Sequence, residues 1–185
     1  MSKADTRFSL RQAKHWAVEA MEAIAVYSPR IEVAGSIRRQ RDDVGDIDLV
    51  VLDISEENPW VRSQIARVLM ELGYAQTKDG ERIASFTRAG KCGLDLYFAT
   101  AETWGITLLI RTGSAAHNVK LTQVAAKCLP VRRLSVARGV LDTAGAVVAS
   151  RTEDAIFHAL GLRWIDPELR EAPEYASWVH EEVVS

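Results

Sequence analysis

The sequence has little of what marks a secreted, membrane-spanning or disordered protein. Its 185 residues include only two cysteines and five prolines, which excludes a disulfide framework and favours a reducing, cytoplasmic location, or the host cytoplasm for a viral protein. No apolar run reaches the roughly 18 to 20 residues that cross a membrane. The first residues form no apolar signal segment. With 48% hydrophobic and 26% charged residues, the composition is that of a folded protein with one domain or two small subdomains.

Acidic residues are missing from a long central stretch. Between Glu102 and Asp142 there is neither Asp nor Glu, although the net charge of the chain is −2. The basic residues of this stretch are Arg111, Lys120, Lys127, Arg132, Arg133 and Arg138. Such a distribution predicts a basic surface for nucleic acid phosphates. A solvated helix face with chance clustering is the alternative.

Residues 1–102 mix helical and strand patterns, which predicts a subdomain with a mixed β-sheet and two helices. The first helix follows Ser9-Leu-Arg-Gln12, which has the form of a capping box. The second follows Asn58-Pro59, in which we expect Asn58 to be the N-cap and Pro59 the first helical residue. The expected strands are 31–34, 47–52, 82–88 and 94–99, of which the last two form a hairpin.

Residues 103–185 have mainly helical periodicity, which predicts a second subdomain of helices with a small β-sheet. The periodicity pauses at Thr112-Gly113-Ser114. Turn residues among valines predict a hairpin within 136–148. Ser150-Arg-Thr-Glu153 has the form of a capping box for a helix over 153–160. The fold class predicted for the whole chain is therefore mixed α+β.

Two aspartates with one residue between them stand at the start of the strand at 47–52. Asp46 and Asp48 point to the same face of an extended chain, where like charges repel each other unless a cation is shared. Asp95 lies between two leucines on the strand expected at 94–99. If this strand is the neighbour of the strand at 47–52, Asp95 lies beside Asp46 and Asp48. Three carboxylates suit two Mg²⁺ ions, with Mn²⁺ as a substitute. The alternative is that Asp46 caps a turn and Asp48 pairs with an arginine.

Gly35-Ser36 follows the strand at 31–34 directly. A glycine there permits close approach of a ligand to the backbone, and the serine offers an amide and a hydroxyl. Arg38 and Arg39 follow. This combination predicts a phosphate-binding turn, with an ordinary strand-to-helix turn and solvated arginines as the alternative.

Together these motifs resemble the nucleotidyltransferase superfamily and, more narrowly, the family X DNA polymerases. The likeness covers roughly residues 7 to 175. It implies a palm subdomain at 1–102 and a thumb subdomain at 103–185, in a minimal form without lyase and fingers modules, as in a small viral member. The matching segments are Gly35-Ser-Ile-Arg-Arg39, Gly45-Asp-Ile-Asp48, Leu94-Asp-Leu96, Arg111-Thr-Gly-Ser114, Glu153-Asp-Ala-Ile-Phe157 and Ile165-Asp-Pro-Glu-Leu-Arg-Glu171.

The resemblance implies a DNA-directed DNA polymerase that adds deoxynucleoside triphosphates (dNTPs) to a primer 3′-hydroxyl by two-metal-ion transfer, in short-gap filling or repair. Asp46 and Asp48 would bind both metals, and Asp95 would complete the catalytic-metal site. The implied nucleotide-binding residues are Gly35, Ser36, Arg39, Gly45, Gly113, Ser114 and Asn118. The expected partners are dNTP and primed or gapped DNA, bound by the six basic residues of the acid-free stretch. We expect a monomer that does not associate with membranes.

Several positions depart from the family pattern. Ile110-Arg111 replaces an aromatic pair, Thr122 stands where many members have an arginine, and Val44 and Gly93 replace a small hydroxyl residue and an arginine. The change at Ile110-Arg111 affects sugar discrimination and minor-groove packing, and the change at Thr122 points to low fidelity. Two other functions stay open, namely a nucleotidyltransferase that works without a template or on RNA or protein, and an inactive nucleic-acid-binding module.

The remaining aromatic, histidine and cysteine side chains have no spacing that indicates a site. Trp16, Trp60 and Trp104 are expected to pack inside the fold, and Cys92 and Cys128 to be inert thiols. His117 is a candidate for nucleotide contact because it is next to Asn118.

Overall fold

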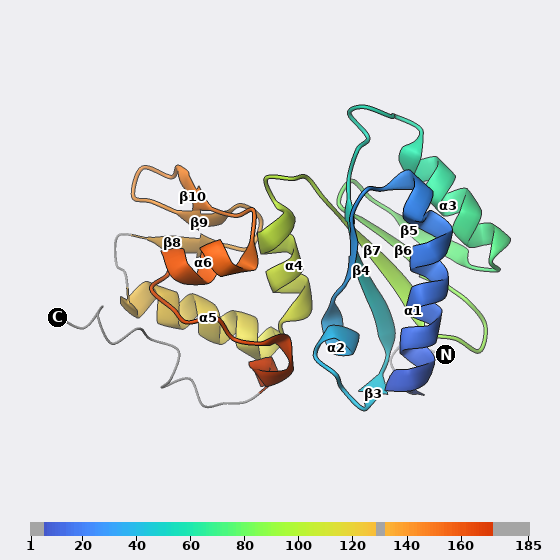
Figure 1. Ribbon diagram of the computed structural model, residues 1–185, viewed down its shortest axis with the longest axis horizontal. Helices are drawn as coiled ribbons and strands as arrows, with labels where there is room; N and C mark the ends of the chain where they lie inside the picture. The colour runs from blue at the N-terminus through green and yellow to red at the C-terminus, as the bar shows by residue number, and fades with distance from the viewer. Residues whose placement is uncertain (1–5, 129–131, 172–185) are drawn as a thin grey trace. The chain divides into compact units, whose positions relative to one another are not determined.

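The computed structural model describes residues 6–128 and 132–171. The chain divides into two compact units, Met1–Thr100 and Ala101–Ser185 (Figure 1). Both units combine helices with β-sheet, which confirms the predicted α+β class. None of the helices within the described ranges has the length and apolar character that a membrane crossing needs.

The first unit is built on a five-stranded sheet with the order β2-β4-β7-β6-β5. β4 and β7 are parallel, and the other neighbouring pairs are antiparallel. All four predicted strands are confirmed, whereas β5 was not predicted because its sequence, AQTKD, is polar and mostly exposed. A separate pair of short strands joins β1 (Phe8–Ser9) to β3 (Asp43–Val44). The sheet strands are β2 (Ile31–Val33), β4 (Asp46–Leu52), β5 (Ala75–Asp79), β6 (Ile83–Thr87) and β7 (Gly93–Ala99).

Two helices, α1 (Leu10–Ile24) and α3 (Val61–Glu71), pack into one apolar core with the sheet. The 3₁₀ helix η1 (Ala25–Tyr27) follows α1. The core takes alternate residues of the central strands, Ile47, Leu49 and Val51 from β4 and Leu94, Leu96 and Phe98 from β7. Because successive side chains of a strand point to opposite faces, the residues between them lie on the other face of the sheet.

The capping box of α1 is confirmed, but the cap expected for α3 is wrong. Ser9 Oγ accepts a hydrogen bond from Gln12 N, and Gln12 Oε1 accepts one from Ser9 N. At α3 the N-cap is Trp60, and Asn58 Oδ1 instead accepts from Trp60 N at 3.1 Å. Asn58 therefore closes the turn that precedes the helix.

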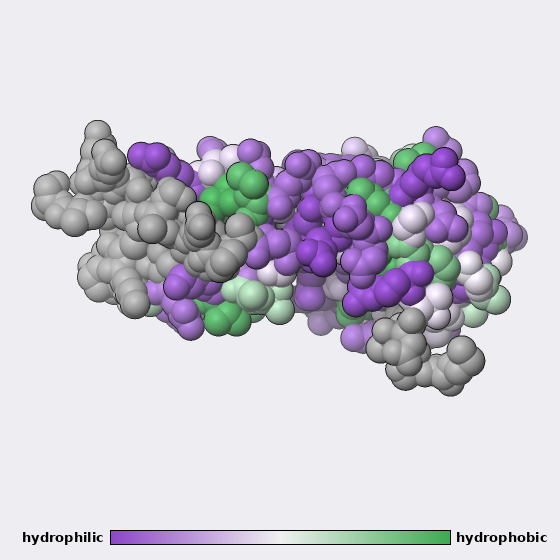
Figure 2. Space-filling view, turned by 90° about the horizontal axis from the view of Figure 1, so that it is seen from below, coloured by the Kyte–Doolittle hydropathy of each residue, from purple (hydrophilic) through white to green (hydrophobic). Residues whose placement is uncertain are grey.

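Trp60 also departs from the packing expected of it. Its side chain is 72% exposed, whereas Trp104 is buried and Trp16 is half-buried against Phe8. The buried side of α3 consists of Val61, Ile65, Ala66 and Leu69, and Trp60 lies outside this stripe because it precedes the helix. The face seen in Figure 2 is mostly hydrophilic, with hydrophobic atoms in separate patches.

The second unit combines helices with a three-stranded antiparallel sheet, ordered β10-β9-β8. The hairpin predicted within 136–148 corresponds to the antiparallel pair of β9 and β10, and β8 adds a third strand that was not predicted. Its helix α6 is capped by Thr152, whose Oγ1 accepts from Ala155 N at 3.1 Å. The predicted cap, Ser150, instead donates its hydroxyl to Glu102 O. The elements are α4 (Trp104–Thr112), α5 (Ala115–Cys128), β8 (Arg133–Ser135), β9 (Gly139–Leu141), β10 (Val147–Ala149), α6 (Glu153–Ala159) and the 3₁₀ helix η2 (Pro167–Glu171).

A buried ion pair joins η2 to α6. Arg170 Nη1 lies 2.7 Å from Glu153 Oε1, and the two side chains are 0% and 5% exposed. Arg170 Nε also donates to Ile165 O at 3.0 Å, and its guanidinium lies over the rings of Phe157 and Trp164. Breaking such a pair leaves an uncompensated buried charge, so this contact holds η2, part of the matching segment Ile165–Glu171, against α6.

Candidate active site

The pairing of β4 with β7 brings the predicted carboxylates to one face of the sheet. Asp48 is the register partner of Asp95, and Asp46 is the partner of Gly93. Neighbouring strands lie about 4.8 Å apart, so Asp48 and Asp95 are adjacent and Asp46 lies one pleat away. Asp46 is exposed and the other two are half-buried. Because the intervening leucines and isoleucine fill the core, the three carboxylates point away from α1 and α3.

The predicted phosphate-binding turn lies directly against Asp48. Gly35 begins the short helix α2 (Gly35–Arg38) with a φ of +56°. A Cβ atom at this position would lie 1.8 Å from Asp48 Oδ2 and 2.8 Å from Asp48 Cγ. Ala34 N also donates to Asp48 O at 2.8 Å. Only glycine therefore fits between this backbone and the carboxylate, which places the turn and the aspartates in one site.

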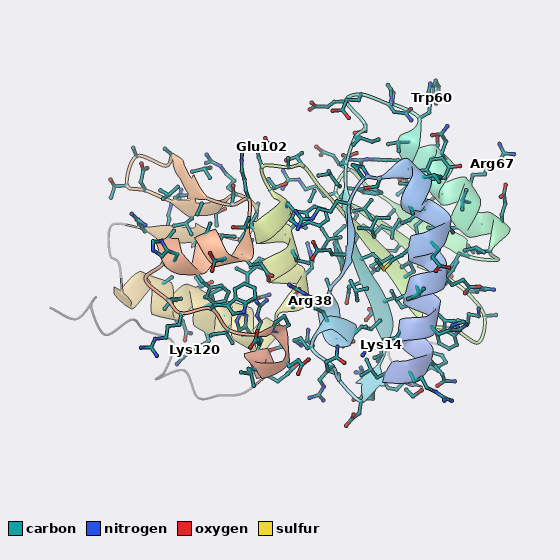
Figure 3. All side chains as sticks on the ribbon, viewed as in Figure 1. Lys14, Arg38, Trp60, Arg67, Glu102 and Lys120 are labelled. Atoms are coloured by element: carbon teal, nitrogen blue, oxygen red, sulfur yellow. The ribbon has the colours of Figure 1, made fainter. Side chains whose placement is uncertain are left out.

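The end of the turn is held by local hydrogen bonds. Arg39 N donates to Gly35 O at 3.2 Å, and Arg41 N donates to Ser36 O at 3.0 Å. Gln40 has a φ of +57°, and its Oε1 accepts from Lys14 Nζ at 2.6 Å. Figure 3 labels Lys14 and Arg38, which come from α1 and α2. The half-buried side chains of Arg38 and Arg39 thus follow Gly35 within about one helical turn.

The turn between β6 and β7, just before Asp95, is joined to α1 by Glu19. Glu19 Oε2 lies 3.0 Å from both Lys91 Nζ and Arg88 Nη1. Partial burial would raise the pKa of Glu19, but the hydrogen bonds and charges of Lys91 and Arg88 outweigh it, so the pKa lies below its usual value. This ionised contact fixes the β6–β7 turn against α1.

Cys92 lies next to the site without taking part in it. Its side chain is fully buried. Burial raises the pKa of the Cys92 thiol to about 11, and the charge of Asp46 adds to the effect. The thiol therefore stays protonated at neutral pH, as expected of an inert cysteine. The side chain of Cys128 lies outside the described residues.

The donor set suits a hard divalent cation. Carboxylate oxygens are the ligands that Mg²⁺ and Mn²⁺ prefer. Across the described residues, no three His, Cys, Asp or Glu side chains are grouped so that they could hold a metal ion as they stand. The adjacent pair, Asp48 and Asp95, is thus the part of the predicted metal site that the sheet itself assembles, with Asp46 farther along the same face.

The α4–α5 junction brings together the predicted nucleotide-binding residues of the second unit. Gly113 ends α4, and Ser114 Oγ accepts from His117 N at 3.1 Å at the start of α5. Asn118 Nδ2 donates to Ile110 O at 2.8 Å. A Cβ atom on Gly113 would lie 2.3 Å from Asn118 Oδ1 and 2.8 Å from His117 Nδ1. A glycine is thus needed for Asn118 to pack against the end of α4.

His117 supports this junction from inside. Its side chain is 0% exposed, which leaves no surface for the nucleotide contact that we expected of it. Its Nδ1 lies 3.3 Å from Asn118 Oδ1. His117 is therefore placed to orient the Asn118 amide. The sequence shows that the two residues are adjacent, but the burial that separates this role from a nucleotide contact is seen only in the structure.

The predicted DNA-binding residues all lie in the second unit, in different settings. Arg111 and Arg133 are exposed, and Lys120 is half-buried. Arg132 Nη1 donates to Ala159 O at 2.6 Å, at the end of α6. The exposed Arg138 donates to Gly145 O at 3.2 Å. The side chain of Lys127 lies outside the described residues. Arg132 is thus also part of the unit's internal framework.

Ser85 is a neighbour of the site that we did not predict. It is the register partner of Asp95 on β6, and its side chain is buried. The carboxylate of Asp95 therefore lies in a row between Asp48 and Ser85 on the same face. Counting residues back through the predicted hairpin turn would have placed Ser85 there.

Comparison with known proteins gives two matches. Residues 107–171 match the family described as DNA polymerase beta thumb. The chain is also 26% identical over 174 residues to the DNA polymerase/3'-5' exonuclease PolX of Bacillus subtilis (strain 168), an alignment that covers 92% of this chain and 30% of that protein. The chain thus spans about a third of the length of this curated relative. Both matches support a family X polymerase-like protein, in agreement with the resemblance found in the motifs.

Proposed function

We propose that the chain is a metal-dependent nucleotidyltransferase that extends a DNA primer with dNTPs, the first unit acting as the palm and the second as the thumb. One observation carries the proposal. Asp48 is the register partner of Asp95, and the Asp48 carboxylate lies against Gly35, the left-handed residue that begins the turn after β2. A cluster of negative charge beside an arginine-rich turn suits a triphosphate that arrives with its cations.

The first unit is proposed to hold the reacting groups. In the reaction the primer 3′-oxygen bonds to the α-phosphorus of the dNTP, the bond to the departing oxygen breaks, and pyrophosphate leaves. Asp46, Asp48 and Asp95 would hold two Mg²⁺ ions, or Mn²⁺ in their place, and such ions activate the attacking hydroxyl and neutralise the leaving phosphate. Asp95 is the proposed acceptor of the hydroxyl proton.

The same unit is proposed to bind the β- and γ-phosphates. Ser36 supplies an amide and a hydroxyl, and Arg39 supplies charge-assisted hydrogen bonds. Gly35 and Gly45 let the phosphates approach the backbone. In this arrangement the carboxylates and the arginines bind successive parts of one ligand.

The second unit is proposed to hold the nucleoside and the DNA. Gly113 and Ser114 would line the sugar, and Asn118 would contact the base. The six basic residues from Arg111 to Arg138 would contact DNA phosphates, so binding should weaken steeply with salt. Thr122 Oγ1 donates to Asn118 O at 2.9 Å. Because this hydroxyl is already bonded within α5, we propose that Thr122 discriminates little between templating bases. Short-gap filling with low fidelity, by a monomer, follows as the proposed role.

The test is primer extension on a duplex with a one-nucleotide gap, in Mg²⁺ or Mn²⁺, with each templating base and with both sugar types. We expect template-directed addition of dNTP, and Asp95→Asn to lower the rate about a thousandfold while DNA affinity stays unchanged. Asp154→Asn, which neutralises an exposed carboxylate of the second unit, is the matched control.

Each alternative outcome would contradict the proposal in a different way. Addition that ignores the templating base would favour a template-independent transferase. An Asp95→Asn variant that extends primers at the normal rate would contradict the metal assignment. Binding without turnover in any metal would leave a nucleic-acid-binding module.

A further inference from the structure

The first unit also carries a groove that the carboxylate site does not use. It lies between α3 and the end of β5 and has a volume of about 610 Å³. Trp60 and Met70 line it from the α3 side, and Gln76, Asp79 and Glu81 line it from β5 and the turn that follows. The groove therefore follows the outer strand of the sheet.

An exposed apolar pair forms one wall of this groove. Trp60 is 72% exposed and Met70 is 49% exposed. The backbone of Trp60 is fixed, because its N donates to Asn58 Oδ1 at 3.1 Å and its O accepts from Ser63 Oγ at 2.7 Å. Figure 3 shows Trp60 at the start of α3. Aromatic and thioether groups exposed beside a groove are typical of binding surfaces.

The charge of the groove is negative. Asp79 and Glu81 are exposed, and among the described residues no ion pair neutralises either carboxylate. The lining cation, Arg62, is already bound to the Asp53 carboxylate and to Glu81 O, and it lies over the ring of Phe98. Two carboxylates beside an indole attract a cationic side chain with an apolar stem and repel the phosphates of nucleic acid.

The edge of the sheet offers backbone groups next to this wall. β5 is the last strand in the order β2-β4-β7-β6-β5, so no described strand pairs with its outer edge. Four of its five residues are exposed. An extended peptide can add a strand to such an edge, with main-chain hydrogen bonds giving affinity and side-chain pockets giving specificity.

We propose that the outer edge of β5 and this groove bind an extended basic segment of a partner protein. The segment adds a strand beside β5 and places an arginine or lysine between Trp60 and the carboxylates of Asp79 and Glu81. This interaction does not depend on the proposed polymerase activity, because none of these residues belongs to the carboxylate site or to the phosphate-binding turn.

The test is calorimetric titration of the full chain with a synthetic heptapeptide that alternates arginine and valine. We expect saturable binding of one peptide per chain, and new protection of β5 amides in hydrogen exchange. Trp60→Ala, and separately the pair Asp79→Asn with Glu81→Gln, should each weaken binding at least about tenfold. Primer extension by these variants should be unchanged.

The controls separate this site from general electrostatics. Glu22→Gln with Glu168→Gln changes the net charge equally at exposed residues outside the groove, and it should leave affinity unchanged. A glutamate–valine peptide should not bind. Absence of binding by the arginine peptide, or equal loss in the control pair, would overturn the proposal. So would oligo(dT) affinity that Trp60→Ala removes, since that would identify a nucleic acid site.

Discussion

Each unit places one glycine against a polar side chain of its candidate site, and the two contacts are made in different ways. Gly35 approaches Asp48 with a φ of +56°, whereas Gly113 approaches Asn118 with a φ of −51°. Asp48 is placed by the register of β4 and β7. Asn118 is placed by hydrogen bonding to Ile110 O and by its contact with His117.

The difference indicates how each site tolerates change. At Gly35 both the backbone conformation and the neighbouring carboxylate exclude a larger residue. At Gly113 the backbone suits any residue, and only the contact excludes one. The first site is therefore a property of the sheet backbone, while the second depends on a few side-chain hydrogen bonds that can rearrange.

Gly35→Ala should have the largest effect. The new Cβ must displace the Asp48 carboxylate, and a displacement of about 1 Å can cost about a hundredfold in rate. The left-handed backbone adds about 1 kcal/mol of destabilisation. Primer extension and urea unfolding measure the two effects.

The control for Gly35→Ala is Gly90→Ala. Gly90 has a φ of +72° with nothing near its Cβ position, so this variant should lose about 1 kcal/mol of stability and keep its activity. Equal activity losses in the two variants would mean that strain, and not contact with Asp48, impairs the site.

Gly113→Ala should have a smaller effect, mainly on nucleotide binding. A Cβ atom 2.3 Å from Asn118 Oδ1 must push the amide away, and we expect KM for dNTP to rise about tenfold, the equivalent of one lost hydrogen bond, with little change in kcat. In an Asn118→Ala background the same substitution should cost less, because only the contact with His117 Nδ1 at 2.8 Å is left.

Gly145→Ala is the control for Gly113→Ala, because nothing lies within 4 Å of its Cβ position. It should leave KM unchanged. Independent, additive effects of Gly113→Ala and Asn118→Ala would contradict the contact between them.

The two contacts also differ in how far the sequence predicts them. The strands that hold Asp48 and Asp95 are readable from apolar runs, but their parallel pairing joins segments separated by α3, β5 and β6. Local patterns do not determine such a long-range register. The carboxylate site was therefore predicted only on the condition that these strands are neighbours, and the contact of Gly35 with Asp48 was not predicted.

The errors in the second unit have a similar cause. Ser150 and Thr152 are both good capping residues, and the choice depends on Glu102, a distant residue whose carbonyl takes the Ser150 hydroxyl. The position of His117 next to Asn118 predicts a contact with the nucleotide, whereas the burial of His117 depends on the packing of the whole unit. The sequence shows which residues can cap a helix or contact a ligand, but it does not show which of several hydrogen-bond partners each side chain takes in the folded unit.

The ion pair between Asp53 and Arg62 shows how charge contributes to the stability of the first unit. In the first unit, burial would raise the pKa of Asp53, but hydrogen bonds from Arg62 and Ser55 outweigh it and lower the pKa. A lowered carboxyl pKa stabilises the fold above the unfolded pKa of about 3.9, and this stability is lost as the pH falls through the folded pKa.

Asp53→Asn should therefore cost about 1 kcal/mol at pH 7, an amount reduced by the partial exposure of Arg62. The difference from the unsubstituted protein should shrink as the pH falls below the unfolded pKa of about 3.9 and through the folded pKa. Urea unfolding from pH 7 to pH 2 measures it. A difference that stays constant with pH would show that packing, not charge, is lost.

Gln40→Gly should have the smallest effect and the opposite sign. Gln40 has almost the same φ as Gly35, +57° against +56°, but it carries a side chain, and a left-handed residue costs about 1 kcal/mol. Glycine relieves this cost, loses the bonds of the Gln40 side chain with Lys14 and Ile37 O and raises the entropy of the unfolded chain, so we expect a net gain of about 0.5 kcal/mol. Gln40→Ala keeps the strain and loses the same two bonds, and it should therefore destabilise the first unit by about 0.5 kcal/mol. If both variants destabilise equally in urea unfolding, the side-chain bonds of Gln40, and not backbone strain, determine the stability of the turn that carries Arg38 and Arg39.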